Sequence, residues 1–274
     1  MTQASVIRLL ILGLPVGLII SGVIAVKVYY RESTHPHTGF GRSRKAVNRT
    51  DLQSEVQALT NIGERHAALP GRITATVKGL QSTLGGSNMG FKPSQQVYKA
   101  GGLDCYNLVV EIPARSPERA GEIVIAGAHY DSAPGSPGAD ANASGVSACI
   151  ALCQAFANTQ QERTLRIVFF ANGESSAVPP EESGSVAYAR ECKLRGEKVV
   201  AMLSLSSLGY YSTAKYSQKS PPGLTPPLPD TGNFLAVFGR SSGKPLVDTF
   251  QSVMSRNSTL PVAAAVLPDT LTLS

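Results

Sequence analysis

Three side chains that can bind a metal lie close together in the stretch Glu122–Cys153. His129 and Asp131 come at the end of an apolar run, and Asp140 follows in a loop rich in glycine, proline and serine. A histidine ligates zinc through one ring nitrogen, and a carboxylate two residues further on can orient the ring through the other nitrogen. A hydrolytic pair of zinc ions needs further carboxylates, one to bridge the metals and one to act as base. His129 alone would more simply be a satisfied core histidine.

The elements around these residues predict an α/β fold. A buried strand at 123–126 precedes His129, and an apolar helix begins near Ser144, which is the usual arrangement around an α/β site. Further strands are expected at 91–98, 107–112, 164–171, 199–205 and 234–238, and further helices at 51–66, 72–84, 183–194 and 245–255. This alternation predicts three layers, with helices on both faces of a central, mostly parallel mixed sheet. The five prolines between Gln218 and Asp230 predict a surface loop.

The net charge of +6 belongs to the N-terminal region. Residues 1–50 contain seven Lys or Arg and one acidic residue, Glu32, so the rest of the chain holds 18 of each and is neutral. A neutral domain gives no support to nucleic-acid binding. The 274 residues, 42% of them hydrophobic, are enough for one sizeable core.

Leu9–Val26 is an uncharged apolar run of 18 residues, the length of a short membrane span. We expect an uncleaved signal anchor at 1–30, a linker at 31–49 and an α/β domain at 50–274. The basic residues after the run favour a cytosolic domain by the positive-inside tendency, whereas the function that we expect for the domain favours export, which we rank modestly higher. His35 and His37 lie in the linker, where solvated side chains are the simpler interpretation.

The four cysteines, Cys105, Cys149, Cys153 and Cys192, have no Cys-x-x-Cys spacing. Cys149 and Cys153 are four residues apart on an apolar helix, so buried small hydrophobic residues are favoured over ligands. A Cys105–Cys192 disulfide is an open alternative in an oxidising compartment.

Three motifs carry a resemblance to a known family. GAHYDS (127–132), GADANASG (138–145) and FFANGE (169–174) resemble the zinc exopeptidases of the aminopeptidase Y and bacterial leucyl aminopeptidase type, and GYYS (209–212) extends the similarity. The resemblance implies that His129 ligates one zinc, that Asp131 orients His129, and that Glu174 ligates the other zinc. It also implies that Asp140 bridges two zinc ions and is followed by a cis peptide bond to Ala141. Peptides are then the expected substrates or ligands.

Three features depart from the family pattern. The general base is the first of two adjacent glutamates in the family, but Gly173 stands there, and the pair Glu181–Glu182 is a weak substitute because it lies about eight residues beyond the strand. Ser206 occupies the position of a further carboxylate ligand, and a neutral hydroxyl is a poor zinc ligand. A C-terminal histidine ligand is expected where the chain ends at Ser274, yet none of the four histidines (His35, His37, His66 and His129) follows the central stretch.

Each zinc would therefore keep two protein ligands, whereas catalytic zinc sites normally use three. Loss of a general base alone costs about 10²- to 10⁴-fold in rate. The sequence favours weak or absent catalysis in a membrane-anchored member of this family. Three alternatives stay open: an active exopeptidase, a non-catalytic binding or scaffold ectodomain, and a truncated gene product that lacks an element covering the sheet.

Overall fold

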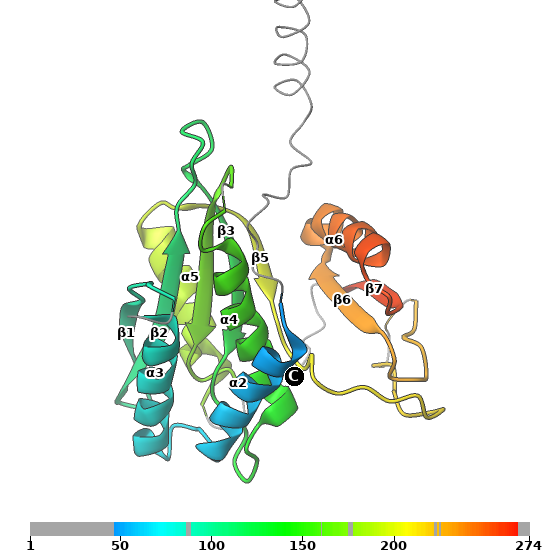
Figure 1. Cartoon of the computed structure of the whole chain (residues 1–274), viewed down its shortest axis with the longest axis horizontal. Helices are drawn as coiled ribbons and strands as arrows, with labels where there is room; N and C mark the ends of the chain where they lie inside the picture. Colours follow the sequence, from blue (N-terminus) through cyan, green and yellow to red (C-terminus); the bar gives the residue numbers. More distant parts are fainter. Residues whose placement is uncertain are drawn as a thin grey trace, which may run out of the picture. The chain divides into compact units, whose positions relative to one another are not determined.

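A five-stranded sheet carries the segments that end in the candidate site residues (Figure 1). Its strands are β1 (Ser94–Ala100), β2 (Leu103–Ile112), β3 (Glu122–His129), β4 (Thr164–Phe170) and β5 (Lys198–Ser204), in the order β1–β2–β4–β3–β5. β3 runs parallel to both β4 and β5, whereas β1 with β2 and β2 with β4 are antiparallel. The sheet is therefore mixed, and its parallel part surrounds the strand that ends at His129.

The structure is a computed structural model that describes residues 47–85, 89–159, 161–174, 178–221, 224 and 226–267. The expected anchor at 9–26, the linker histidines and the chain end at Ser274 lie outside these residues. No helix within the described ranges is long and apolar enough to cross a membrane. The proposed domain boundaries therefore stay a prediction.

Helices cover both faces of the five-stranded sheet, as predicted (Figure 1). α2 (Arg49–Asn61), α3 (Pro70–Leu84) and α4 (Gly145–Phe156) lie on one face, and α5 (Gly184–Leu194) lies on the other. α2 starts earlier than predicted because Asn48, rather than Thr50 or Asp51, caps it, with the Asn48 side chain accepting from Thr50 N–H at 2.9 Å. The helix also ends at Asn61, five residues before the predicted end.

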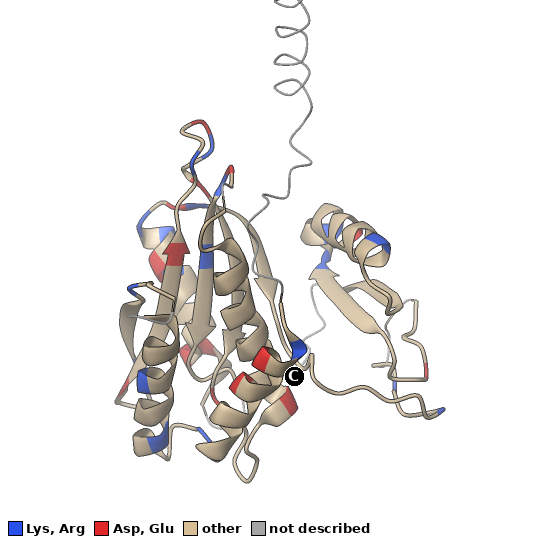
Figure 2. Cartoon of the chain, in the orientation of Figure 1, with Lys and Arg blue, Asp and Glu red and all other residues tan. Residues whose placement is uncertain are grey.

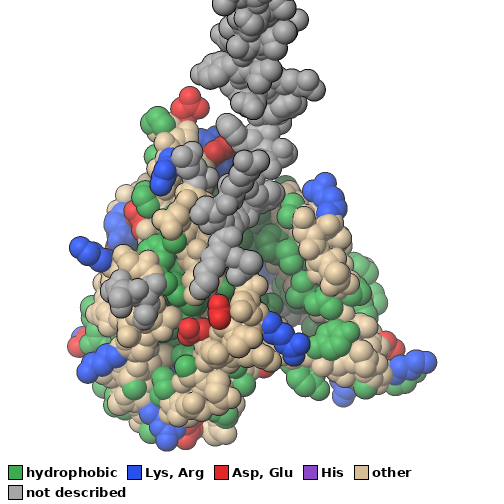
Figure 3. Space-filling model, in the orientation of Figure 1, with side chains coloured by type: hydrophobic (Ala, Val, Ile, Leu, Met, Phe, Trp, Pro, Cys, Tyr) green, Lys and Arg blue, Asp and Glu red, His purple; other side chains and the backbone are tan. Residues whose placement is uncertain are grey.

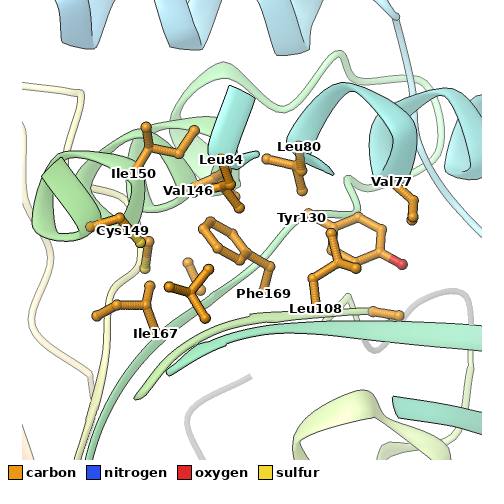
Figure 4. Close-up of a cluster of buried hydrophobic side chains, with 14 of the residues drawn as sticks. Val77, Leu80, Leu84, Leu108, Tyr130, Val146, Cys149, Ile150, Ile167 and Phe169 are labelled. Atoms are coloured by element: carbon orange, nitrogen blue, oxygen red, sulfur yellow. The ribbon is translucent and has the colours of Figure 1, made fainter. Parts of the chain in front are cut away.

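The two faces of the sheet build two separate hydrophobic clusters, because side chains alternate along each strand. Leu108, Ile167 and Phe169 pack under α3 and α4 in the larger cluster (Figure 4). Val168 and Phe170 belong to the smaller cluster beneath α5. Burial of each such large side chain stabilises the fold by about 1.5–3 kcal/mol, so the strand that leads into the site is held rigidly from both faces.

The cysteines lie in these clusters. Cys149 and Cys153 are fully buried in the larger one, as predicted for small hydrophobic residues. The alternative of a Cys105–Cys192 disulfide is wrong for this structure, in which both thiols are free. The two cysteines also pack in different places, since Cys105 belongs to the larger cluster and Cys192 to the smaller one.

A second, two-stranded sheet follows in the chain. β6 (Leu235–Arg240) and β7 (Val262–Leu267) are parallel and are connected by α6 (Lys244–Asn257). The predicted strand at 234–238 and helix at 245–255 are confirmed, but β7 was missed because its sequence, VAAAVL, is mostly alanine, which has low strand propensity. The loop at 218–230 is irregular where described, although Leu224 is buried against Ala265 and Leu267.

β5 is an edge strand of the five-stranded sheet and exposes three apolar side chains, Val199, Val200 and Met202. Lysine, arginine and acidic residues are scattered over the described elements, and the face in view has no extended patch of one sign (Figures 2 and 3). This distribution agrees with the equal numbers of basic and acidic residues after residue 50.

Candidate functional site

β3 delivers His129 and Asp131 to the end of the sheet in direct contact with each other. The distance from His129 Nδ1 to Asp131 Oδ1 is 3.2 Å, and the Asp131 carbonyl oxygen is equally close. Asp131 is almost fully buried, with 1% of its surface exposed. Burial lowers the pKa of His129, but the hydrogen bond to Asp131 and the charges of Asp131 and Glu174 outweigh it, so the pKa lies above its ordinary value. The contact leaves Nε2 as the ring nitrogen available to a ligand.

Asp131 also fixes the turn that follows β4. Gly173 N–H donates to Asp131 Oδ1 at 2.8 Å, and Glu174 N–H donates to Asp131 Oδ2 at 2.9 Å. The turn brings Glu174 Oε1 within 3.9 Å of His129 Nε2. His129 and Glu174, two of the three predicted metal ligands, are therefore brought together by one buried carboxylate.

Gly173, at the predicted position of the general base, lies directly against His129. A Cβ atom added at Gly173 would overlap both Cβ and Cγ of His129. No side chain fits there without displacement of the histidine or of the turn. The packing around His129 therefore leaves room for glycine but not for a larger residue at position 173.

Asp140, the third predicted ligand, faces a different loop. Its Oδ1 atom accepts from Gly209 N–H at 2.8 Å and from Tyr210 N–H at 3.1 Å, within the GYYS motif. The predicted cis bond between Asp140 and Ala141 is wrong by one residue, because the cis bond joins Ala141 and Asn142. The side chain of Ala141, which precedes that bond, has no donor atom for a metal.

The segment that follows β5 contains Ser206, at the predicted position of the lost ligand. Ser206 is exposed, and the backbone on either side of it is bound by side chains from 140–144. Asn142 Nδ2 donates to Leu205 O at 2.9 Å, and Ser144 Oγ accepts from Leu208 N–H at 2.9 Å. The segment is fixed through its backbone rather than through a side chain at 206.

Arg65 supports the loop between Asp131 and Asp140 and was missed in the sequence. It is fully buried, and its guanidinium donates to backbone carbonyls at five positions: Leu59, Gly63, Tyr130, Pro137 and Gly138. Burial lowers its pKa, and the charge of Asp131 partly offsets this. A single arginine between two helices gives no sequence signal for such a role, since its acceptors are all backbone atoms.

The remaining acidic and histidine candidates lie in other contacts. Glu182, part of the suggested substitute pair, is in a 3₁₀ turn (Pro180–Glu182), where its Oε2 accepts from Gly101 N–H at 2.6 Å. Glu181 is in the same turn and is exposed. His66 Nε2 is 3.2 Å from Glu64 Oε2.

These residues do not fit a catalytic pair of zinc ions. Within the described ranges, no group of three or more His, Cys, Asp or Glu side chains is arranged to hold a metal ion. His129 and Glu174 converge, but a catalytic zinc site uses three protein ligands. The third carboxylate, Asp140, uses one of its oxygens for two backbone amides instead.

Comparisons with known proteins agree with the motifs. Residues 107–252 match Peptidase family M28. The uncharacterized protein YfbL of Escherichia coli strain K12 is 35% identical over 129 residues, which cover 44% of this chain and 39% of YfbL. The chain thus spans about two fifths of the length of that relative.

Solved structures share the fold at low sequence identity. A Zn-dependent exopeptidase from Parabacteroides distasonis is similar with a TM-score of 0.56 and 16% identity, over 82% of this chain and 79% of that one. A leucine aminopeptidase precursor from Bacteroides thetaiotaomicron is similar with a TM-score of 0.58 and 13% identity, over 82% and 80% of the two chains. At such identities the likeness shows the fold alone.

Proposed function

Because the chain belongs to peptidase family M28, we propose that it is a zinc-exopeptidase relative that binds peptides and hydrolyses them weakly or not at all. The observation that carries this proposal is the contact of Gly173 with His129. The glycine occupies the predicted position of the base, and the histidine fills the space that a glutamate side chain would need.

The lack of a general base at position 173 should lower the rate of peptide hydrolysis. In hydrolysis assisted by a metal, a carboxylate takes the proton of the attacking water, and its loss costs about 10²- to 10⁴-fold. Glu174 is the remaining carboxylate of the turn, and its oxygen already faces His129 Nε2 at 3.9 Å. If Glu174 ligated a zinc ion, its carboxylate would be poorly placed to act as the base as well.

Zinc is the metal that the family suggests, and the proposal limits how it is held. His129 and Glu174, which approach each other within 3.9 Å, are the candidate ligands for one weakly bound ion. Ser206 offers no charged ligand. Two converging donors leave the affinity well below that of a site with three or four protein ligands.

We also propose that the domain is anchored to a membrane and faces the extracytoplasmic side. The support is the uncharged run Leu9–Val26, which is long enough for a short span. Export suits a protein that meets peptides, although the basic residues after the run argue for the opposite orientation. Protease protection of tagged full-length chain in intact vesicles would show the orientation.

The test of the function uses the full-length chain in detergent, supplied with Zn²⁺. We expect release of leucine from leucine p-nitroanilide to be equal to, or only slightly faster than, the release by an H129A variant, and we expect saturable binding of an unlabelled peptide by both proteins. The H129A variant removes the histidine of the site, so it controls for contaminating peptidases. Hydrolysis by the wild type that is more than about 10⁴-fold faster than in H129A would contradict the proposal.

Release that depends on Zn²⁺ distinguishes a weak enzyme from a binding ectodomain without activity. A weak enzyme and a binding ectodomain both retain peptide affinity, but only the enzyme gives a slow release that depends on Zn²⁺. A chain that neither binds peptide nor releases amino acid would rule out both.

A further inference from the structure

Three side chains of the loop 140–144 hold the segment 205–210 entirely through its backbone. They are Asp140, Asn142 and Ser144, and we call this arrangement the clasp. The N–H groups of four consecutive residues donate to them: Ser207 to Asn142 Oδ1 at 3.3 Å, Leu208 to Ser144 Oγ at 2.9 Å, and Gly209 and Tyr210 to Asp140 Oδ1 at 2.8 and 3.1 Å. In the other direction, Asn142 Nδ2 donates to Leu205 O at 2.9 Å.

Hydrogen bonds within residues 140–145 also fix the side chains of the clasp. Ser144 Oγ donates to the Asp140 carbonyl oxygen at 2.7 Å, and Gly145 N–H donates to Asn142 Oδ1 at 3.2 Å. A Cβ at Gly145 would overlap Leu205 O, and a Cβ at Gly209 would lie 3.0 Å from Ser144 Cβ. The two backbones approach so closely that glycine is needed at Gly145, which keeps the three side chains in reach of their partners.

We infer that the carboxylate of Asp140 is a structural anion of the clasp and does not bridge metal ions. One of its oxygens accepts two consecutive backbone N–H groups, an arrangement in which N–H dipoles stabilise an anion. No group of three metal-binding side chains among the described residues includes Asp140. The clasp joins the end of β5 to the start of α4, a connection that a bridging metal would otherwise provide between the same two loops.

This inference goes beyond the proposed function, because it concerns the protein without metal and without substrate. A clasp can exist whether or not peptides are hydrolysed. Its test therefore has a first arm that is measured in EDTA, where no result depends on activity.

In the first arm, hydrogen exchange is measured on the full-length chain in EDTA for wild type, D140A, S144A and E182A. We expect the exchange of the Gly209 and Tyr210 amides to rise at least about tenfold in D140A, and that of Leu208 to rise in S144A, because each amide loses its acceptor. E182A is the matched control, since Glu182 also accepts a backbone N–H, from Gly101. In E182A, only the Gly101 amide should exchange faster.

In the second arm, the same proteins and H129A are titrated with ZnCl₂ against a chromophoric chelator. A bridging Asp140 requires D140A to lose at least about tenfold in affinity, as H129A would. The clasp predicts a change below about threefold. A wild type that binds no Zn²⁺ supports the inference equally, because Asp140 is then no ligand.

Should D140A fail to fold, D140N keeps an oxygen acceptor but loses the charge, and it should give an intermediate rise in exchange. Exchange of Gly209 and Tyr210 within threefold of wild type in both variants would overturn the inference. So would a tenfold loss of zinc affinity in D140A or D140N with the fold intact.

Discussion

Asp131 and Asp140 bind neighbouring loops in the same way, yet they differ in what else they contact. Each carboxylate accepts the N–H groups of two consecutive residues, Gly173 and Glu174 in one case and Gly209 and Tyr210 in the other. Only Asp131 also contacts a histidine, and only Asp131 is almost fully buried. Asp131 therefore joins a loop to the histidine that we propose as a zinc ligand, whereas the Asp140 carboxylate contacts backbone amides of a loop.

In this structure the segment after β5 is held in place by hydrogen bonds to side chains of the loop 140–144. Around Asp140, hydrogen bonds between side chains and backbone hold the loop that contains Ser206. Such contacts satisfy backbone groups that would otherwise be unpaired. These hydrogen bonds would hold the loop whether or not a metal is bound.

The largest predicted effect comes from Asp131. The D131N variant should lose about 3 kcal/mol of stability, because a buried acceptor of two amides and an imidazole becomes an amide that must place an NH₂ group against donors. Urea unfolding of metal-free protein measures the loss. D140N is the matched variant and should lose about 1 kcal/mol. Equal losses would remove the distinction between the two carboxylates.

Gly173 gives the next effect. G173A and G173E should each cost about 2 kcal/mol, because any Cβ at this position overlaps His129. G173E should also leave hydrolysis at background, since the added carboxylate displaces the histidine that it would serve. G121A is the control, because a Cβ at Gly121 meets no atom within 4 Å. A G173E protein with wild-type stability and new activity would show that the turn can adapt.

Glu197 offers a reference carboxylate away from both loops. Burial raises its pKa, but hydrogen bonds and charges from Arg166, Cys192 and Arg195 outweigh this and lower it to about 2. Because the folded pKa lies below the unfolded one, the stabilisation is complete above about pH 4.5 and is lost as the pH falls towards 2.

At neutral pH, E197Q should be less stable than wild type by about 1–2 kcal/mol, and the difference should shrink as the pH falls through that window. Thermal unfolding of both proteins between pH 3 and 7 measures it. A difference that is constant with pH would mean that the ion pairs with Arg166 and Arg195 contribute nothing.

The smallest effect should come from Glu182. E182A should change stability by about 0.5 kcal/mol or less and should leave any hydrolysis unaffected, because its carboxylate binds Gly101 N–H in a partly exposed turn. A selective loss of leucine p-nitroanilide hydrolysis in E182A would identify a substitute base that the geometry does not indicate.

The sequence predicted most of the fold because its signals are local. The strands that lead to His129 and Gly173 are continuous apolar runs, and the helix with Cys149 and Cys153 is mostly apolar. The spacing and the length of these apolar runs are therefore enough to predict the elements. The strand β7 was not predicted because its sequence is rich in alanine, which has a low propensity for strands. The clusters to which Cys105 and Cys192 belong depend on the tertiary packing around each thiol, which sequence spacing alone does not give.

The site was less predictable, for physical reasons. The motifs located His129, Asp131 and Glu174, whose contacts follow from two adjacent parallel strands. Asp140 has a carboxylate that could ligate a metal, but its hydrogen-bond partners are backbone amides almost seventy positions away along the chain. Every residue except proline has a backbone N–H, so such a contact cannot be predicted from residue types. The same holds for the Arg65 guanidinium, which donates to backbone carbonyl oxygens.

The most direct test of the account is the zinc content of the full-length chain. Protein equilibrated with a small excess of ZnCl₂, then passed through a desalting column, is analysed for bound metal together with H129A. We predict clearly less than two zinc ions per chain, with any bound ion lost in H129A, because only two ligands converge. Two retained zinc ions per wild-type chain would contradict the account.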